Sequence, residues 1–123
     1  MNYDYIAGFF DGEGSVCAQR AGNNVHFKLD ISNTNKEVLE KIKEFLDNQG
    51  IKSSLYTRKL YEGRKQAYDL VICNKKDILE VLFNIMCKVI VKRPQVEYLL
   101  THISLLMGGN NKFNIVEYRA LYS

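Results

Sequence analysis

The sequence predicts an α+β fold in which a four-stranded antiparallel sheet carries helices on one face. Two observations predict this fold. Apolar and polar residues alternate in two pairs of segments, and each pair is joined by a glycine-containing turn. Segments with helical spacing of apolar residues precede, separate and follow these pairs, which produces the order α-β-β-α-β-β-α-α. Because the chain has 123 residues, we expect one compact domain over residues 1–123.

The first helix and the first hairpin come before residue 33. Aromatic and small residues from Tyr3 to Asp11 predict a short buried helix, and helix stop signals accumulate from Gly12 to Gly14. Alternation over Ser15 to Arg20 and over Val25 to Ser32 predicts two strands, with Gly22-Asn23-Asn24 as the turn.

The second half repeats this arrangement. Thr34 followed by Glu37 has the form of a capping box, which opens a helix that Gly50 closes. Strands are expected at Lys52 to Leu60 and Lys65 to Cys73, around a turn at residues 61–64. Further helices are expected from Asp77 to Met86, from Pro94 to Gly108-Gly109, and briefly within the tail at 110–123.

The sheet face without helices collects polar and basic side chains. Such a face could dock in the major groove of DNA, where donors and acceptors read base edges. An antiparallel sheet with one face simply in water would show the same pattern, so strand parity alone leaves both readings open. The face comprises Cys17, Gln19, His26, Lys28, Asp30, Ser32, Lys52, Ser54, Tyr56, Arg58, Lys65 and Asp69.

Charge distribution favours a polyanionic partner. Between Gly50 and Leu70 there are five basic and two acidic residues, an excess equal to the +3 of the whole chain. Lys88, Lys92 and Arg93 form a second basic cluster. A solvated charged face also explains such clusters, so charge by itself is a weak indication.

Composition argues against several other classes. No apolar stretch approaches the roughly 20 residues that span a bilayer, and the N-terminus lacks the pattern of a signal peptide. The three cysteines are widely spaced and the two histidines lack neighbours at zinc spacing, so neither a disulfide framework nor a zinc site is expected. We expect a reducing compartment, cytoplasmic or organellar, with no secretion and no membrane partner.

Residues 6–14, Ile-Ala-Gly-Phe-Phe-Asp-Gly-Glu-Gly, resemble the LAGLIDADG motif of the homing endonuclease family, and Ser15-Val16 continues the resemblance. Ile6, Phe9, Phe10, Gly12 and Glu13 depart from the eponym, each by a conservative change. The resemblance extends over about the first hundred residues. It implies the αββαββα fold of the family, with a saddle-shaped sheet, and the single-motif type that works as a homodimer.

The motif explains how a metal site would form. Small residues on one helix stripe allow two helices to approach closely, so two copies of the helix would meet at the dimer axis. The paired Glu13 carboxylates would then lie side by side and bind Mg²⁺ or Mn²⁺, with the Gly12 carbonyl as a further ligand implied by the resemblance. Asp11 is expected to orient the helix end. The expected interface residues are Ala7, Gly8, Phe9, Asp11 and Gly12.

The resemblance also implies two other catalytic residues. Asn33 occupies the place of a water-ordering polar residue, with Ser32 or Asn35 as substitutes, and Lys92 occupies the place of a lysine near the scissile phosphate. Asn33 could instead cap a helix, and Lys92 could merely hold a phosphate. A further basic residue near Asn33 is not evident, although Lys36 is nearest.

The implied activity is a metal-dependent double-strand break in a long, pseudo-palindromic DNA target, leaving 3′ overhangs, by an intron-encoded enzyme without an organic cofactor. Lys28, Lys52, Lys65 and Arg93 are expected on phosphates, and Gln19, Tyr56 and Arg58 on bases. A slip of one residue in a strand would reverse these facings. Two alternatives remain: a maturase or regulator on the same scaffold without cleavage, and an α+β module that assembles through its small-residue helix.

Overall fold

The computed structural model describes residues 1–22, 24–102 and 113–121. The elements follow the predicted order, which confirms the α+β class, and a short helix stands within the C-terminal tail. They are α1 (Tyr3–Glu13), β1 (Gly14–Ala21), β2 (Asn24–Asn33), α2 (Lys36–Asn48), β3 (Ser54–Thr57), β4 (Tyr68–Ile72), α3 (Lys75–Ile85), α4 (Arg93–Thr101) and α6 (Ile115–Arg119). The expected end of the fourth helix at Gly108-Gly109 lies outside the described residues.

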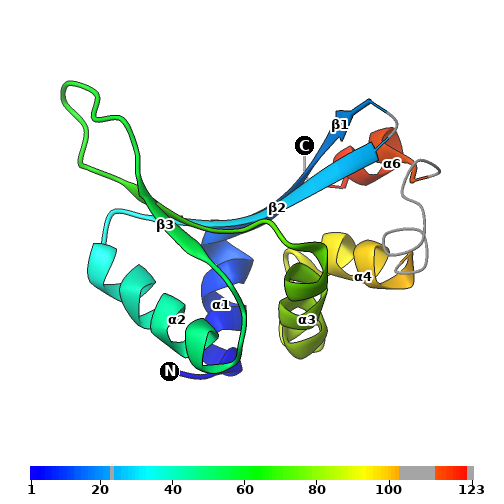
Figure 1. Cartoon of the computed structure of the whole chain (residues 1–123), viewed down its shortest axis with the longest axis horizontal. Coiled ribbons are helices and arrows are strands. Elements are labelled where there is room, and N and C mark those ends of the chain that lie inside the picture. Colours follow the sequence, from blue (N-terminus) through cyan, green and yellow to red (C-terminus); the bar gives the residue numbers. More distant parts are fainter. Residues whose placement is uncertain (23, 103–112, 122–123) are drawn as a thin grey trace.

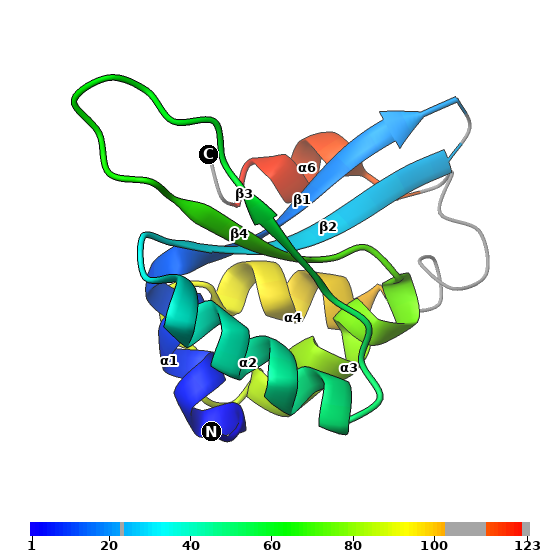
Figure 2. The same cartoon turned by 60° about the vertical axis from the view of Figure 1, so that its left-hand side comes forward.

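The four strands form one antiparallel sheet in the order β1-β2-β4-β3. Helices α1 to α4 lie on one side of it, and the opposite face is concave and open (Figures 1 and 2). Strand pairing places Cys17 opposite Lys28, Ser32 opposite Asp69, and Asp69 opposite Tyr56. Polar residues on the strands therefore share the open face, as the alternation predicted.

The covered face supplies the core. Ile6 and Phe10 of α1 pack with Leu29 and Ile31 of β2 and with apolar residues of the other helices. All four are at most 1% exposed. Burial of this one face fixes the register of the sheet, because a shift by one residue would expose every core residue of a strand.

The start of α2 differs from the prediction. Asn35, not Thr34, is its N-cap, and the Asn35 side-chain oxygen accepts a hydrogen bond from Val38 N at 3.2 Å. The capping box at Thr34 and Glu37 was therefore wrong by one residue. Asparagine caps a helix at least as well as threonine, so the sequence offered two adjacent candidates and local geometry selected the second.

The second hairpin is also shorter than predicted. β3 ends at Thr57 and β4 begins at Tyr68, so the strands assigned to 52–60 and 65–73 were too long. Arg58 N donates to Ala67 O at 2.9 Å, and beyond this bond the chain projects as a loop over residues 58–67 (Figure 1). Leu60 and Tyr61 are exposed there, because the loop projects past the helices that could bury them. Lys52 and Lys65 consequently lie outside the strands.

The short helix α6 protects the free edge of β1. Tyr118 Oη donates to Val16 O at 2.6 Å, and Arg119 donates to Ala18 O through Nε at 3.1 Å and Nη2 at 2.8 Å. An unpaired edge strand would otherwise present carbonyls to other chains. Tyr118 also packs against Phe27. Among the described residues, no helix has the length and apolar character to cross a membrane.

The first prediction concerns this edge. Tyr118→Phe removes the hydroxyl that satisfies a buried carbonyl, and we expect the free energy of unfolding to fall by about 1–2 kcal/mol in urea titrations. Tyr98→Phe is the matched control, because the Tyr98 hydroxyl makes an exposed 3.4 Å contact with Glu117. Equal losses in the two variants would show that the edge contact does not stabilise the sheet.

Candidate functional site

Glu13 is the last residue of α1 and is exposed. Its carboxylate forms no hydrogen bond or ion pair with any residue that the structure describes. The last carbonyls of a helix lack intrahelical partners, and they give this end a partial negative charge. A free carboxylate at that end is an unfavourable arrangement that a cation relieves. The oxygen donors present, the Glu13 carboxylate and the Gly12 carbonyl, are those that Mg²⁺ prefers.

A tight junction holds Glu13 in place. Gly14 ends α1 and begins β1 without an intervening loop, and it is buried. A Cβ at Gly14 would collide with the ring of Phe10. Glycine is therefore required at the last position of the motif, because the strand leaves the helix directly over a core aromatic ring. Gly14 pairs with Ile31 in the sheet, so the end of β2 runs beside the end of α1.

Within the part of the chain that the structure describes, one copy does not assemble a group of side chains that could hold a metal ion. The described residues contain no group of three or more histidine, cysteine, aspartate or glutamate side chains that could hold a metal ion. Ligands in addition to Glu13 would have to come from backbone, water, DNA or a second copy.

Asp11 ties α1 to the segment before α4. Its carboxylate accepts hydrogen bonds from Lys92 N at 2.8 Å and from Ile90 N at 3.1 Å. Burial tends to raise the pKa of Asp11, but these bonds and the charge of Lys92 outweigh it and lower the pKa. The backbone of Lys92 is thereby held against α1. The Lys92 ammonium group itself forms no hydrogen bond or ion pair with the described residues, whereas Arg93 donates to Val89 O and Cys87 O.

Asn33 ends β2, and its side-chain oxygen accepts a hydrogen bond from Asn35 N at 2.7 Å. This bond forms an Asx turn just before α2, whose N-cap is Asn35, so Asn33 does not itself cap the helix. The Asn33 amide hydrogens have no partner among the described residues. Ser32 is the polar side chain at this end of β2 that lies on the open face.

The exposed stripe of α1 is narrower than expected. Ala7 is 1% exposed and belongs to the core of the single chain, so its side chain is not part of this exposed stripe. The stripe comprises Tyr5, Gly8 and Gly12, with Phe9 half-buried and stacked on Tyr5. A Cβ at Gly8 or Gly12 would meet nothing within 4 Å. Since a glycine inside a helix costs about 1 kcal/mol relative to alanine, the chain's own packing does not explain Gly8.

A hydrogen-bonded network lies at the centre of the open face. Arg58 donates to Asp69 through Nε at 2.6 Å and through Nη2 at 2.8 Å, and Nη2 also donates to Ser32 Oγ at 2.8 Å. Ser32 Oγ in turn donates to Asp69 at 2.6 Å. Beside them, Lys28 lies 3.7 Å from the carboxylate of Asp30. Five of the expected DNA-binding residues therefore contact one another, a coupling that strand parity does not reveal.

The pKa values of the two carboxylates in this network are shifted in opposite directions. Burial tends to raise the pKa of Asp69, but hydrogen bonds from Arg58 and Ser32 outweigh it and lower the pKa to about 2. Burial and the neighbouring Asp69 carboxylate raise the pKa of Asp30. Asp69 is therefore the anion that the Arg58 guanidinium stabilises.

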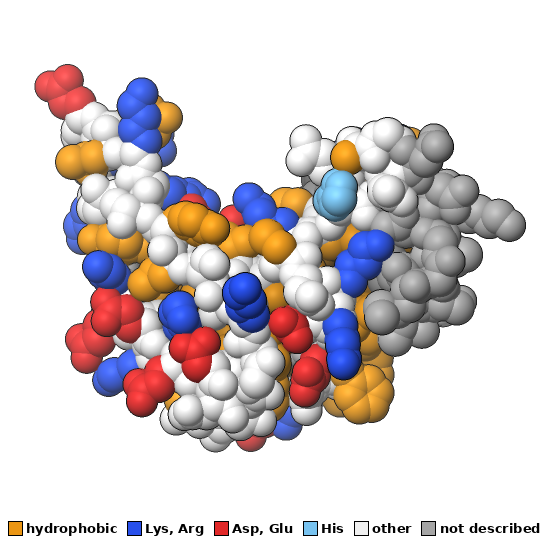
Figure 3. Space-filling view, in the orientation of Figure 1, with side chains coloured by type: hydrophobic (Ala, Val, Ile, Leu, Met, Phe, Trp, Pro, Cys, Tyr) orange, Lys and Arg blue, Asp and Glu red, His pale blue; other side chains and the backbone are white. Residues whose placement is uncertain are grey.

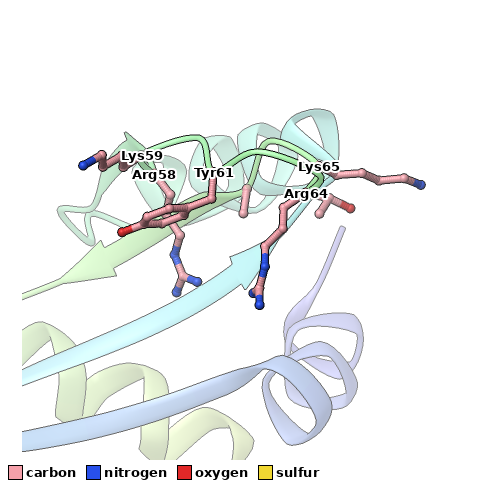
Figure 4. Close-up of a pocket in the computed structure, with 7 residues that line it drawn as sticks. Arg58, Lys59, Tyr61, Arg64 and Lys65 are labelled. Carbon is pink, nitrogen blue, oxygen red and sulfur yellow. The ribbon is translucent and has the colours of Figure 1, made fainter.

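The loop over residues 58–67 carries a second, more strongly basic group. Arg58 and Arg64 extend from the loop toward the sheet, while Lys59 and Lys65 extend to either side (Figure 4). These side chains border a hollow beside the loop. It is lined by Thr34, Arg58, Lys59, Tyr61, Arg64, Lys65 and Ala67. In the space-filling view the loop overhangs the concave face with basic side chains on it (Figure 3).

The sequence did not identify Lys59, Tyr61 and Arg64 as residues that line this hollow, although the excess of basic residues between Gly50 and Leu70 was evident. It placed Lys59 within an overlong strand and Tyr61 and Arg64 in a plain turn. The signal that marks the loop is Gly63, whose φ is +77°. Gln19, His26, Ser54 and Tyr56 lie on the open face as expected, while Lys52 precedes β3.

The sheet, the helices beneath it and the N-terminal motif together define the fold of LAGLIDADG homing endonucleases. The chain belongs to the LAGLIDADG-like domain family, whose pattern matches residues 3–86. A stretch of 55 residues, 45% of the chain, is 38% identical to the uncharacterized protein MJ0314 of Methanocaldococcus jannaschii. That match spans 21% of the archaeal protein.

Solved structures agree with this assignment. The homing endonuclease I-CvuI, in complex with its DNA target, has a TM-score of 0.73 at 18% identity, over 97% of this chain and 80% of its own. The archaeal intron-encoded homing endonuclease I-Vdi141I, complexed with DNA, has a TM-score of 0.70 at 26% identity, with the same coverage. The meganuclease I-AabMI, bound to uncleaved DNA, has a TM-score of 0.71 at 20% identity, over 98% of this chain and 43% of its own.

The second prediction separates the two central carboxylates. Because the pKa of Asp69 is depressed, its contribution to stability is present above pH 4 to 5 and is lost as the pH falls toward about 2. Asp69→Asn should lower the free energy of unfolding at pH 7 by about 1–2 kcal/mol, allowing for solvent screening, and should flatten the loss in acid.

The pKa of Asp30 is shifted in the opposite direction, so its effect on stability has the opposite dependence on pH. Its raised pKa means that its contribution is present at low pH and is lost as the pH rises through that pKa. Asp30→Asn should therefore leave stability at pH 7 unchanged or raise it. Urea unfolding at pH 7 and pH 3 tests both variants, and equal losses at pH 7 would contradict the assignment of the charge to Asp69.

Proposed function

We propose that this protein is a site-specific homing endonuclease that acts as a homodimer and cuts both strands of a long, pseudo-palindromic DNA target. Cleavage requires Mg²⁺ or Mn²⁺ and leaves 3′ overhangs, and the gene lies within an intron. The observation that carries the proposal is the free Glu13 carboxylate, fixed at the exposed end of α1 beside an open, polar sheet.

The relatives support the nuclease assignment. The solved neighbours are homing endonucleases with DNA bound, and I-CvuI was captured with 2 mM Ca and with 2 mM Mg. This chain covers 80% of I-CvuI but 43% and 44% of I-AabMI and I-GzeII. It therefore spans less than half the length of these two longer nucleases.

The site itself calls for a second copy. One Glu13 supplies a single carboxylate, and two copies that meet along Gly8 and Gly12 would bring a pair of them together. Both glycines are exposed and neither is required by contacts within the chain. Close approach of two helix backbones is the arrangement in which glycine is favoured over alanine.

Phosphodiester hydrolysis needs an activated water and stabilisation of charge on the phosphate and the leaving oxygen. Glu13 and the Gly12 carbonyl would hold the metal ions, which would supply a Lewis acid and a reactive water. Lys92 places its ammonium group near the scissile phosphate and stabilises the charge that develops there. Asp11 orients Lys92 through its backbone. The free amide hydrogens of Asn33 hold water beside these groups.

Binding divides between two regions. Phosphates contact Lys52 and three cations of the loop, Lys59, Arg64 and Lys65, none of which forms an ion pair with a described residue. Base edges contact Gln19, His26, Ser54 and Tyr56 on the strands. Arg93 contributes less to phosphate binding than its position in the sequence implied, because its guanidinium group already donates to two carbonyls.

The third prediction tests Glu13 on DNA that joins the two sequences flanking the gene. The protein should make one double-strand break in magnesium. Glu13→Gln should lower the cleavage rate by about a hundredfold or more, because it removes a metal ligand. Binding in calcium should persist, since the change removes negative charge near phosphates. Glu44→Gln, an exposed carboxylate on α2, is the control.

Two outcomes would contradict this assignment in different ways. Cleavage by Glu13→Gln at the normal rate would remove Glu13 from the metal site. Salt-sensitive binding of the normal protein without any cleavage would instead favour the maturase or regulator on the same scaffold.

The fourth prediction tests the dimer through Gly8→Ala. In an isolated chain the new methyl group meets no neighbour, and it should raise stability by up to about 1 kcal/mol through helix propensity. Across a close helix contact it should weaken association, which sedimentation measures. Asn84→Ala on the exposed side of α3 is the matched control. A variant that gains stability and remains dimeric would place the interface elsewhere.

A further inference from the structure

The open face contains two basic regions with different charge balance. At its centre, Lys28 and Arg58 each lie within ion-pair distance of an aspartate, Asp30 and Asp69 respectively. On the projecting loop, Lys59, Arg64 and Lys65 form no ion pair with a described residue. The central region is therefore close to neutral as a group, whereas the loop carries an excess of positive charge.

This difference separates two kinds of DNA contact. A phosphate is an anion, and the carboxylates of Asp30 and Asp69 oppose its approach to the centre of the sheet. A base edge is a neutral set of donors and acceptors, so these carboxylates do not repel it. The centre thus favours base edges and the loop favours phosphates.

The donor groups of Arg58 are partly used within the protein. Its Nε donates to Asp69, and its Nη2 donates to both Asp69 and Ser32. A guanidinium group has five N–H donors in one plane, so the two on Nη1 remain. Because Asp69 holds the Nε and Nη2 edge, Nη1 is on the side of the group that points away from Asp69.

The Arg58 side chain is also immobilised before any ligand arrives. Three hydrogen bonds of 2.6 to 2.8 Å fix it to Asp69 and Ser32, on two different strands. A free arginine loses considerable rotamer freedom when it binds, and an already ordered one loses less. Fixed donors also discriminate between acceptors by position, which an exposed loop lysine without an ion pair does not.

We propose that Arg58 reads a guanine at one position of each half-site, and that Asp69 and Ser32 are the positioning residues that make this reading specific. Guanine is the base that presents two adjacent acceptors, N7 and O6, in the major groove. This inference rests on the proposed DNA binding, and it adds which base is read and which side chains impose the choice.

The experiment selects duplexes from a randomised pool with the full-length protein in calcium, followed by sequencing of the bound fraction. The normal protein should enrich guanine at one position and its symmetry-related mate. Asp69→Asn keeps the shape but loses the charge-assisted pair, so the preference there should fall about tenfold. Preferences at other positions should change little.

Two further variants make the result decisive. Ser32→Ala removes one hydrogen bond and should reduce the same preference by a smaller factor, and it is informative even if Asp69→Asn fails to fold. Lys59→Ala is the loop control, and it should weaken binding to all duplexes alike and lower the salt dependence by about one phosphate contact.

The outcomes distinguish this inference from the proposed function. If the normal protein binds duplexes with a guanine preference that neither Asp69→Asn nor Ser32→Ala alters, the positioning role is wrong while the nuclease proposal stands. Selection of a base other than guanine at the position that Asp69→Asn changes would overturn the choice of base. Failure of the normal protein to bind any duplex would overturn both proposals.

Discussion

The direct passage from α1 into β1 is the constraint on which the rest of the site depends. Gly14 lies over the ring of Phe10 with no room for a Cβ, so the helix ends and the strand begins at adjacent residues. Phe10 anchors the helix in the core, and Gly14 pairs with Ile31 in the sheet. The backbone of Glu13 lies between these two anchored residues, so its free carboxylate extends from a fixed point at the end of α1.

A second constraint links the site to the segment just before α4, far along the chain from α1. Asp11 accepts backbone hydrogen bonds from Ile90 and Lys92, so the segment that carries Lys92 is held against the same helix that carries Glu13. The acidic residues of the motif thereby have different roles. The Asp11 carboxylate is occupied by backbone hydrogen bonds that hold the fold together, whereas the Glu13 carboxylate remains available for a ligand.

Charge on the open face is organised in the same way. Asp69 is paired with Arg58 and buried enough to define its orientation, whereas the lysines of the projecting loop are unpaired. A protein that must hold any DNA and yet prefer one sequence needs both kinds of group. Exposed cations without ion pairs supply affinity for phosphates, and ordered, charge-balanced groups supply discrimination between bases.

From residues alone, the element order, the facing of β2 and the identity of the motif were predictable. Alternation from Val25 to Ile31 and the glycines around Glu13 are local patterns, and local patterns survive in any fold that buries one face. Tertiary structure decided the burial of Ala7, the end of β3 at Thr57, and the pairing of Arg58 with Asp69. Each of these three features depends on which distant segment of the chain packs against the residue. The alternation of residues along one strand contains no information about which strand or helix lies next to it.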